Sequence, residues 1–381
     1  MKKIYWRPSK VPRVVLVVIA IIAITSMISV ELMKVHRKQP YYPEKLQAAQ
    51  LMKEGMEAIR KYRVKHFDPI DEEVDPANSG LIGLPASPIT SKFGYLPAKQ
   101  TTINPNWAAV MVEMLKRAGT KKGDLVAMGF SGSFPSINLA ALVSAEVLNL
   151  KAIPITSVAA STWGANIPEF TWLDMERVLY QRKIVSSRSV AASLGGQDDR
   201  ALARSRKGRD LLNEAIVRNK VELVEIESSK ESLDARMAIY QKFARGERIK
   251  AYVNVGGGTV SVGTAAGKKL FKPGLNQRFS SSALRIDSVM SRFAREGIPV
   301  IHIIHVDDLA EQYGLPKSPN TMPSAGEGHI LIKVEYNLFL VVANLIIMVF
   351  ILYIFLRSDV GYRIFGSKRI TQTPKHPEPM V

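Results

Sequence analysis

Two apolar runs near the ends of the chain constrain its fold more than any other feature of the sequence. Residues 14–30 and 336–356 contain no Asp, Glu, Lys or Arg. An apolar helix of about 17–25 residues is long enough to cross the hydrocarbon core of a bilayer. We therefore expect one transmembrane helix over residues 14–33, another over residues 336–356, and a folded region of the chain between them.

Basic residues around these runs predict the orientation of the chain. Five Lys and Arg residues follow the second run, whereas only Lys317 and Lys333 lie within about 20 residues before it. Because short cytoplasmic segments are rich in Lys and Arg, we expect both termini in the cytoplasm and the main domain on the other side of the membrane. The basic segments 1–13 and 357–381 are then cytoplasmic. No A-x-A-like cleavage site follows the first run, which favours an uncleaved anchor over a secretory signal.

The composition of the region between the runs limits its partners. Residues 34–336 hold 42 of the 52 Lys and Arg residues and 31 of the 34 Asp and Glu residues, an excess of 11 positive charges. Such a surface attracts polyanions or anionic lipid headgroups. Its basic stretches lack interleaved aromatic residues, so we expect no nucleic-acid partner. The chain has no Cys, which excludes disulfides and thiolate metal sites.

Helix-like and strand-like segments alternate along this region. Apolar residues at helical spacing between Leu46 and Ile59 predict an amphipathic helix, and a long ordered loop or flap completes a segment over 34–104. From 105 to 335 the alternation predicts an α/β domain with a mostly parallel, Rossmann-like sheet. We expect Asn104 and Asp307 to be helix N-caps. The main strands are expected at residues 124–130, 151–157, 250–255 and 298–304.

Small polar loops follow three of the expected strands. In open parallel sheets, ligands bind beyond the carboxyl ends of the strands. Glycine N–H groups, hydroxyls and helix N-termini together favour a bound phosphate or carboxylate, although the same residues also make ordinary turns. The residues that we expect to bind an anion are Ser131, Gly132, Ser133, Ser157, Thr162, Gly256, Gly257 and Gly258.

Serine catalysis is an alternative use of the first loop. Residues 129–133, "GFSGS", depart from the nucleophile motif G-x-S-x-G at the last position. Ser131 or Ser133 with His305 as base would make the chain an envelope serine hydrolase or transferase. Strand alternation separates His302 from His305, so we expect no metal site, and nothing in the sequence indicates a cofactor.

Residues 123–157, "GDLVAMGFSGSFPSINLAALVSAEVLNLKAIPITS", are similar to a sugar-isomerase (SIS) phosphosugar-binding unit. In that unit a strand leads through a Ser-Gly-rich turn to a helix and then to a strand ending in I-T-S. The similarity covers about 35 residues and supports the α/β fold. It implies an SIS-like phosphosugar-binding module as a further alternative.

Longer blocks carry a resemblance over most of the chain. "WRPSK", "SGLIGLPASPIT", "TTINPNWAA", "GFSGSFPSINLA", "STWGANIPEFTWLDME", "VAASLGG" and "AYVNVGGG" resemble the poly-γ-glutamate system protein family. The resemblance implies membrane-bound poly-γ-glutamate synthase subunits as partners, an anionic capsule or exopolymer as the product, and the bacterial cytoplasmic membrane as the location. It supplies no catalytic residues and no oligomeric state. We expect an accessory component of polymer synthesis or export with an anion-binding domain.

Overall fold

The computed structural model describes residues 13–263 and 267–357. The chain divides into two compact units, one over Lys38–Lys333 and one formed by the chain on either side of it. The expected cytoplasmic segments, 1–13 and 357–381, lie outside the described residues except for Arg13 and Arg357.

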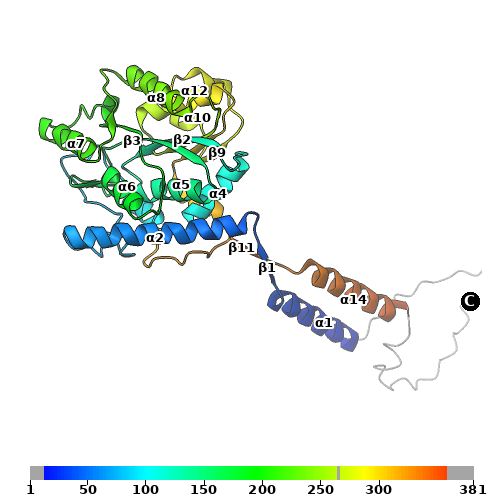
Figure 1. Cartoon of the computed structure of the whole chain (residues 1–381). Coiled ribbons are helices and arrows are strands. Elements are labelled where there is room, and N and C mark those ends of the chain that lie inside the picture. Colours follow the sequence, from blue (N-terminus) through cyan, green and yellow to red (C-terminus); the bar gives the residue numbers. More distant parts are fainter. Residues whose placement is uncertain (1–12, 264–266, 358–381) are drawn as a thin grey trace, which may run out of the picture. The chain divides into compact units, whose positions relative to one another are not determined.

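A seven-stranded sheet, counted over the described residues, forms the centre of the Lys38–Lys333 unit (Figure 1). Strand β9 pairs with β10 in the antiparallel sense, and all other neighbouring strands are parallel. The expectation of a mostly parallel sheet is therefore confirmed. In spatial order the strands are β7 (Glu222–Leu223), β6 (Ala191–Ser193), β3 (Lys151–Ser157), β2 (Leu125–Ser131), β8 (Ile249–Val255), β10 (Val300–Ile303) and β9 (Gly274–Asn276).

The central strands are buried on both faces. In β2, Val126 and Met128 belong to one hydrophobic core, whereas Leu125 and Ala127 belong to the core on the other face. Successive side chains of a strand point to opposite faces, so a sheet covered on both sides needs apolar residues at nearly every position. The unbroken apolar runs of the sequence arise from this double coverage.

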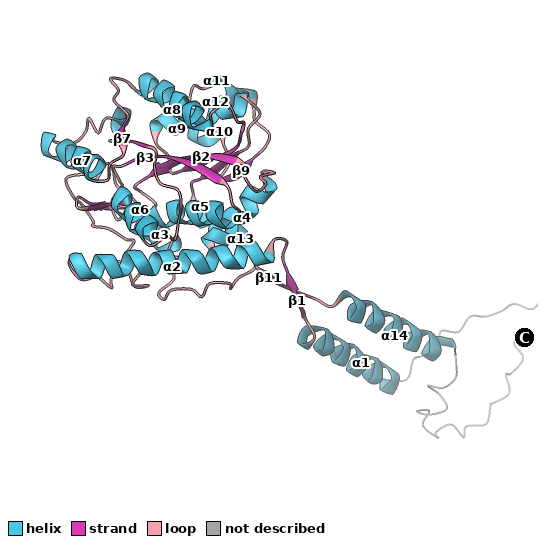
Figure 2. Ribbon diagram, in the orientation of Figure 1, coloured by secondary structure: helices cyan, strands magenta, loops and turns pink. Residues whose placement is uncertain are grey.

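Helices cover both faces of the sheet (Figure 2). One face carries α4 (Trp107–Arg117), α5 (Pro135–Val147), α6 (Trp172–Gln181) and α13 (Val306–Tyr313). The long α2 (Tyr42–His66) packs across α4, α5 and α6 as an outer layer. The opposite face carries α8 (Ser229–Ala244), α9 (Thr259–Val262), α10 (Gly267–Leu270), α11 (Ser281–Arg285) and α12 (Val289–Arg295). The remaining elements are α3 (Leu96–Thr101), α7 (Arg206–Arg218), the short 3₁₀ helix η1 (Gln197–Asp199) and the β4–β5 hairpin (Asn166–Ile167, Phe170–Thr171).

The strand order reverses once in the parallel part of the sheet. The chain builds β2, β3, β6 and β7 outward in one direction, then returns to place β8 on the other side of β2 and β10 beyond it. Loops leave β2 and β8 towards opposite faces at such a reversal, which opens a crevice at the carboxyl ends of the two strands. The fold thus places its ligand crevice between the loops after Ser131 and Val255.

Both expected N-caps are wrong. Helix α4 begins at Trp107, and Asn104 instead accepts a hydrogen bond from Asn106 N at 2.9 Å in the turn before it. Helix α13 begins at Val306, after His305 in the left-handed conformation. Asp307 instead accepts a hydrogen bond from Thr101 Oγ1 at 2.7 Å, a tertiary contact that the local sequence does not reveal.

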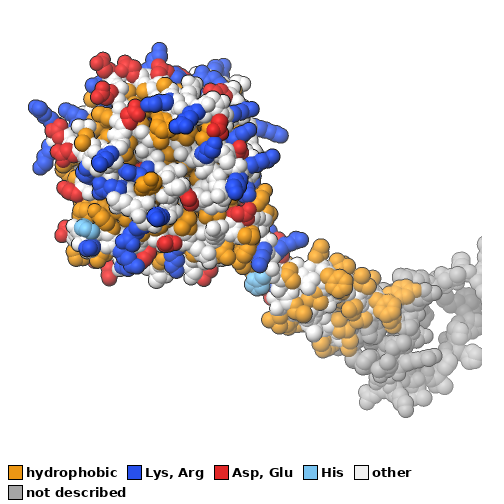
Figure 3. Space-filling model, in the orientation of Figure 1, with side chains coloured by type: hydrophobic (Ala, Val, Ile, Leu, Met, Phe, Trp, Pro, Cys, Tyr) orange, Lys and Arg blue, Asp and Glu red, His pale blue; other side chains and the backbone are white. Residues whose placement is uncertain are grey.

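The other unit contains two apolar helices, α1 (Arg13–Leu32) and α14 (Leu338–Arg357), which contact each other. Asn344 Nδ2 donates to Ser29 Oγ at 3.1 Å between them. Hydrophobic side chains cover their visible surface (Figure 3). None of the helices within residues 13–263 and 267–357 is both long enough and apolar enough to cross a membrane. Two short strands, β1 (Val35–Lys38) and β11 (Ile332–Glu335), form a separate two-stranded sheet.

Candidate functional site

The crevice between β2 and β8 contains a small cavity of about 60 Å³. Its lining combines the two strand ends with the loop before α3 and the loop after β6. The residues that line it are Ser91, Lys92, Phe130, Ser131, Ser133, Ser157, Ala159, Gly196, Asp199, Val255, Gly257, Gly258, Thr259, Val260 and Ser261. We call this cavity the switch-point site.

The loop after β8 supplies the backbone donors of the switch-point site. The N–H groups of residues 257–260 make no hydrogen bond within the part of the chain that the structure describes. Gly256 is held by its own N–H, which donates to Ile303 O at 3.0 Å, and its positive φ of 91° favours glycine. Four successive unpaired N–H groups at a strand end can receive an anionic oxygen.

The loop after β2 contributes hydroxyls rather than backbone donors. Gly132 N donates to Ser157 O at 3.0 Å, and Ser133 N donates to Ser131 Oγ at 3.2 Å. Ser133 Oγ accepts a hydrogen bond from Ser161 N at 3.0 Å. A hydroxyl that accepts such a bond still has its own proton to donate. Ser131, which is half-buried, and Ser133 can therefore each offer one O–H group to a ligand.

A buried ion pair forms the wall next to β3. Arg236 Nη2 and Asp199 Oδ2 are 2.8 Å apart, and both side chains are at most 5% exposed. Asp199 also accepts from Ser193 Oγ at 2.7 Å and from Ser232 Oγ at 2.5 Å, while Arg236 Nη2 donates to Ser157 Oγ at 2.9 Å. The carboxylate is thus neutralised, and it does not repel an anion as a free charge would.

Lys99 lies behind the loop after β2. Its Nζ donates to Ser133 O and, at 2.8 Å, to Ser161 Oγ, and it lies 3.8 Å from the centre of the Phe134 ring. Burial, with a smaller contribution from Lys92, lowers the pKa of Lys99 to about 7. No carboxylate pairs with Lys99 within the described chain. Lys99 therefore fixes the loop and adds positive potential behind the switch-point site.

The structure brings together only part of the expected set. Ser131, Ser133, Ser157, Gly257 and Gly258 line the switch-point site. The remaining two glycines shape its back wall, because a Cβ on Gly132 would lie 2.5 Å from Val158 O and one on Gly256 would lie 3.2 Å from the Cβ of Ser131.

Two expected residues lie elsewhere. Thr162 Oγ1 accepts a hydrogen bond from Gly94 N at 2.6 Å and does not line the site. His305 is exposed at the start of α13, and no hydrogen bond joins it to Ser131 or Ser133 among the described residues. The geometry gives no support to a Ser–His catalytic pair.

His302 is buried in β10, as the strand alternation predicts. Its Nδ1 lies 3.0 Å from Asn254 Nδ2, which also donates to Gly256 O at 2.7 Å. Nδ1 therefore accepts, and the ring supports the loop after β8. Within the described residues, no group of three or more His, Asp or Glu residues is arranged to hold a metal ion.

Several site residues were not anticipated from the sequence. Ser91 and Lys92 belong to the segment expected as a flap, and Asp199 and Arg236 belong to a loop and a helix that carried no motif. The stretch "GGQDDR" after β6 could have indicated Asp199. A glycine pair follows the end of a strand there, as is common in ligand-binding loops of parallel sheets, and Asp199 comes shortly after it.

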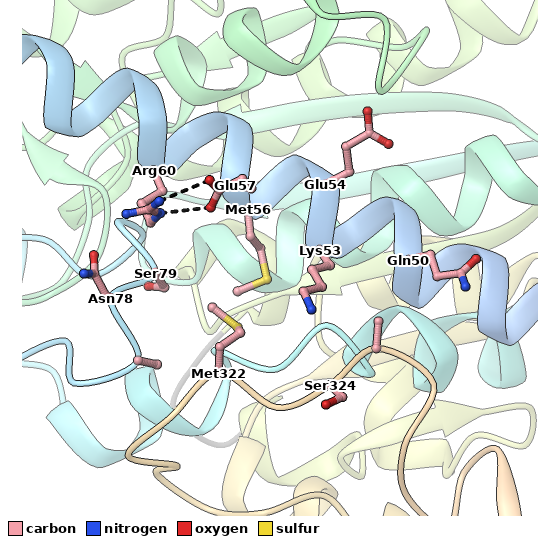
Figure 4. Close-up of a pocket in the computed structure, with 12 residues that line it drawn as sticks. Gln50, Lys53, Glu54, Met56, Glu57, Arg60, Asn78, Ser79, Met322 and Ser324 are labelled. Carbon is pink, nitrogen blue, oxygen red and sulfur yellow. Dashed lines mark hydrogen bonds and ion pairs between the residues drawn. The ribbon is translucent and has the colours of Figure 1, made fainter.

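A larger cavity of the Lys38–Lys333 unit, about 790 Å³, lies elsewhere, between α2 and residues 322–325. Met56 and Met322 point toward one another within it, and Arg60 pairs with Glu57 at 2.9 Å (Figure 4). The charged side chains that line it are exposed or half-exposed. Buried polar groups that converge on one point, which mark the switch-point site, are not found among these lining residues.

Together, the residues with unpaired N–H groups, two serines and Lys92 line a space that fits one small anionic group. Comparison of the chain with protein-family models, with curated proteins and with solved structures gave no match.

Proposed function

We propose that this protein is an accessory component of poly-γ-glutamate synthesis or export, and that its α/β unit binds one carboxylate of the polymer in the switch-point site. The observation that carries the proposal is the row of unpaired N–H groups at residues 257–260, next to Ser131 and Ser133. Each residue of poly-γ-glutamate presents one free carboxylate. The excess of 11 positive charges over 34–336 favours the approach of such a polyanion.

The size of the cavity supports a single group rather than a whole small molecule. Sites for small organic ligands usually enclose about 300–1,000 Å³, whereas the switch-point site encloses about 60 Å³. A phosphosugar needs more space than this, so the SIS-like alternative receives less support. A single carboxylate that projects into the cavity from a polymer outside it needs no more space than this.

The proposal includes two membrane anchors. Helices α1 and α14 coincide with the apolar runs at residues 14–30 and 336–356, and many of their large side chains are exposed. An exposed apolar surface of this extent is typical of a protein that contacts lipid or another protein. With both termini in the cytoplasm, the Lys38–Lys333 unit would meet the polymer outside the membrane, beside the membrane-bound synthase subunits.

A charge substitution at Gly258 tests the anion site. A Cβ at Gly258 meets no atom within 4 Å, and the backbone there has a φ of −61°, so an L side chain is accepted without strain. Gly258→Asp places a carboxylate at the unpaired N–H groups and should weaken binding of purified poly-γ-glutamate about tenfold or more. Gly258→Ala is the matched control and should bind like wild type.

The same variants are then compared in cells. A strain that lacks the gene is complemented with wild type, Gly258→Ala, Gly258→Asp, or Ser131→Ala with Ser133→Ala. Loss of polymer yield or chain length with Gly258→Asp and the double serine variant, but not with Gly258→Ala, is the expected result. Equal polymer from all four would overturn the role of the switch-point site.

A further inference from the structure

A second cavity, of about 470 Å³, lies at the carboxyl-terminal end of α2. This volume falls in the range of about 300–1,000 Å³ that is usual for small-molecule sites. Its walls come from α2, from the segment before Asp75, from residues 82–85 and from the turn between β4 and β5. Much of the wall is apolar, formed by Phe67, Val74, Ile82, Leu84, Ile167 and Pro168.

Arg63 is the buried charged group of this cavity. It is 6% exposed, and its Nη1 donates to Gly80 O at 3.1 Å and to Ile82 O. Its Nε is buried without a partner, and its Nη2 makes no hydrogen bond within the described chain. These contacts tie the loop after Ser79 to α2. Nε is enclosed by protein atoms, so Nη2 is the donor that remains open to a ligand.

Asp75 attracts Arg63 but forms no ion pair with it. Asp75 uses both carboxylate oxygens locally, accepting from Ser79 N at 3.1 Å, from Ser79 Oγ at 2.9 Å and from Gly80 N at 2.8 Å. Burial lowers the pKa of Arg63, and attraction to Asp75 opposes this only in part. Arginine nevertheless keeps its proton at physiological pH, so a buried cation remains beside an open cavity.

The lining residues also include exposed carboxylates. Asp68, Asp71 and Glu169 are exposed, in contrast to the buried Arg63. Asp71 caps a turn by accepting from Glu73 N at 2.9 Å, whereas Asp68 and Glu169 make no ion pair among the residues described. A ligand in the cavity would therefore meet a cation at the base, apolar walls, and carboxylates near the solvent.

We infer that this cavity binds a free α-amino acid with an apolar side chain, with its carboxylate on Arg63 and its ammonium group at Asp68 and Glu169. A carboxylate on Nη2 gives the buried guanidinium a charge-assisted hydrogen bond. The apolar walls then suit the side chain. The exposed carboxylates disfavour an anionic polymer or a phosphate, and a cation alone would leave Arg63 unpaired.

Ligand analogues test the inference on the unmodified protein. Calorimetric titration of the full-length protein in detergent is done with L-leucine, with N-acetyl-L-leucine, which lacks the ammonium, and with 3-methylbutylamine, which lacks the carboxylate. L-leucine should bind, and loss of either charged group should weaken binding about tenfold or more. Absence of L-leucine binding, or equal binding of the analogues, would contradict the inference that this cavity binds an amino acid. Tighter binding of L-glutamate than of L-leucine would contradict the inference that the ligand has an apolar side chain.

Variants of the lining residues test whether L-leucine binds in this cavity. Arg63→Gln should weaken L-leucine binding about tenfold or more, and Asp68→Asn with Glu169→Gln, both at exposed positions, should weaken it several-fold. Arg60→Gln is the matched control, since Arg60 lies one turn earlier on α2, pairs with Glu57 and lines a different cavity. Undiminished binding in the exposed double variant, or an equal loss in Arg60→Gln, would contradict the assignment. Gly258→Asp should leave L-leucine binding unchanged, so this inference and the proposed function can fail independently.

Discussion

Lys99 shows how a single buried residue can determine the pH response of the unit. Its pKa is lowered from 10.5 to about 7, chiefly by burial. An unfolded chain therefore binds more protons than the folded one between pH 7 and pH 10.5, and stability must rise with pH across this window. Below pH 7 both states carry the proton, and the folded state bears the whole penalty of the buried charge.

We expect the free energy of unfolding to increase by something of the order of 4 kcal/mol from pH 7 to pH 10 through this one residue. Lys99→Met should remove that slope, and Lys92→Met, at an exposed position, should keep most of it, because Lys92 contributes less than burial to the lowered pKa. Urea unfolding of the 38–333 fragment at several pH values measures the difference. The same slope in wild type and in Lys99→Met would show that other groups control the response.

The sequence could not reveal Lys99 as a buried residue. Its partners, Ser133 and Ser161, are 34 and 62 residues away in the chain, and Lys99 itself follows a proline in a short helix. The burial of Arg63 was equally hidden, because the carbonyls that it binds belong to Gly80 and Ile82, 17 and 19 residues further along the chain. By contrast, Ser131 and Gly258 were identifiable, since both follow apolar strands whose ends must meet at one edge of a parallel sheet.

At the scale of elements, the length of a strand or helix determined whether the sequence could predict it. Strand β3 occupies 151–157 as expected, and β2 differs from its expected range by one residue at each end. Strand β6 has three residues and β9 has three, too few to show a period of two. Helices α11 and α12 are separate short helices, because Ser288 between them adopts an extended conformation and caps the second one.

The Asp199–Arg236 pair joins elements that are far apart in the sequence. Arg236 on α8 binds Ser157 at the end of β3, Ser193 at the end of β6, and Asp199 in η1. Removing one partner would leave a buried carboxylate without its cation, which typically costs about 3–5 kcal/mol. The pair is therefore expected to hold the carboxyl ends of the strands next to the switch-point site.

We expect Arg236→Met to destabilise the 38–333 fragment by about 3–5 kcal/mol, and Asp199→Asn combined with Arg236→Met to restore part of the loss. Lys151→Met is the control, because Lys151 pairs with Glu247 at 2.9 Å at the surface, where such a pair contributes about 0–1 kcal/mol. Denaturant titration compares the three variants. Equal effects at positions 236 and 151 would contradict the importance of burial.

At the scale of the whole molecule, the two units have different relations to water. The Lys38–Lys333 unit contains its own hydrophobic cores on both faces of the sheet, so it should fold without the rest of the chain. The large side chains of α1 and α14 include many that are about half exposed, and Asn344 of α14 donates a hydrogen bond to Ser29 of α1. Such helices gain their stability from a nonaqueous environment or from a partner.

Cell fractionation tests which environment the helices occupy. We expect the full chain in the membrane fraction, extracted by detergent but not by high salt or alkaline carbonate, and the 38–333 fragment in the soluble fraction with an unchanged circular dichroism spectrum.

Ile346→Lys, at a 62% exposed position of α14, should disrupt membrane integration, because a lysine near the centre of a span costs about 2.5–3.5 kcal/mol. Ile346→Val is the matched control. Full-length protein that is soluble without detergent would mean that α1 and α14 dock on another protein, and the polymer site would then have to be reached from that complex rather than from the membrane.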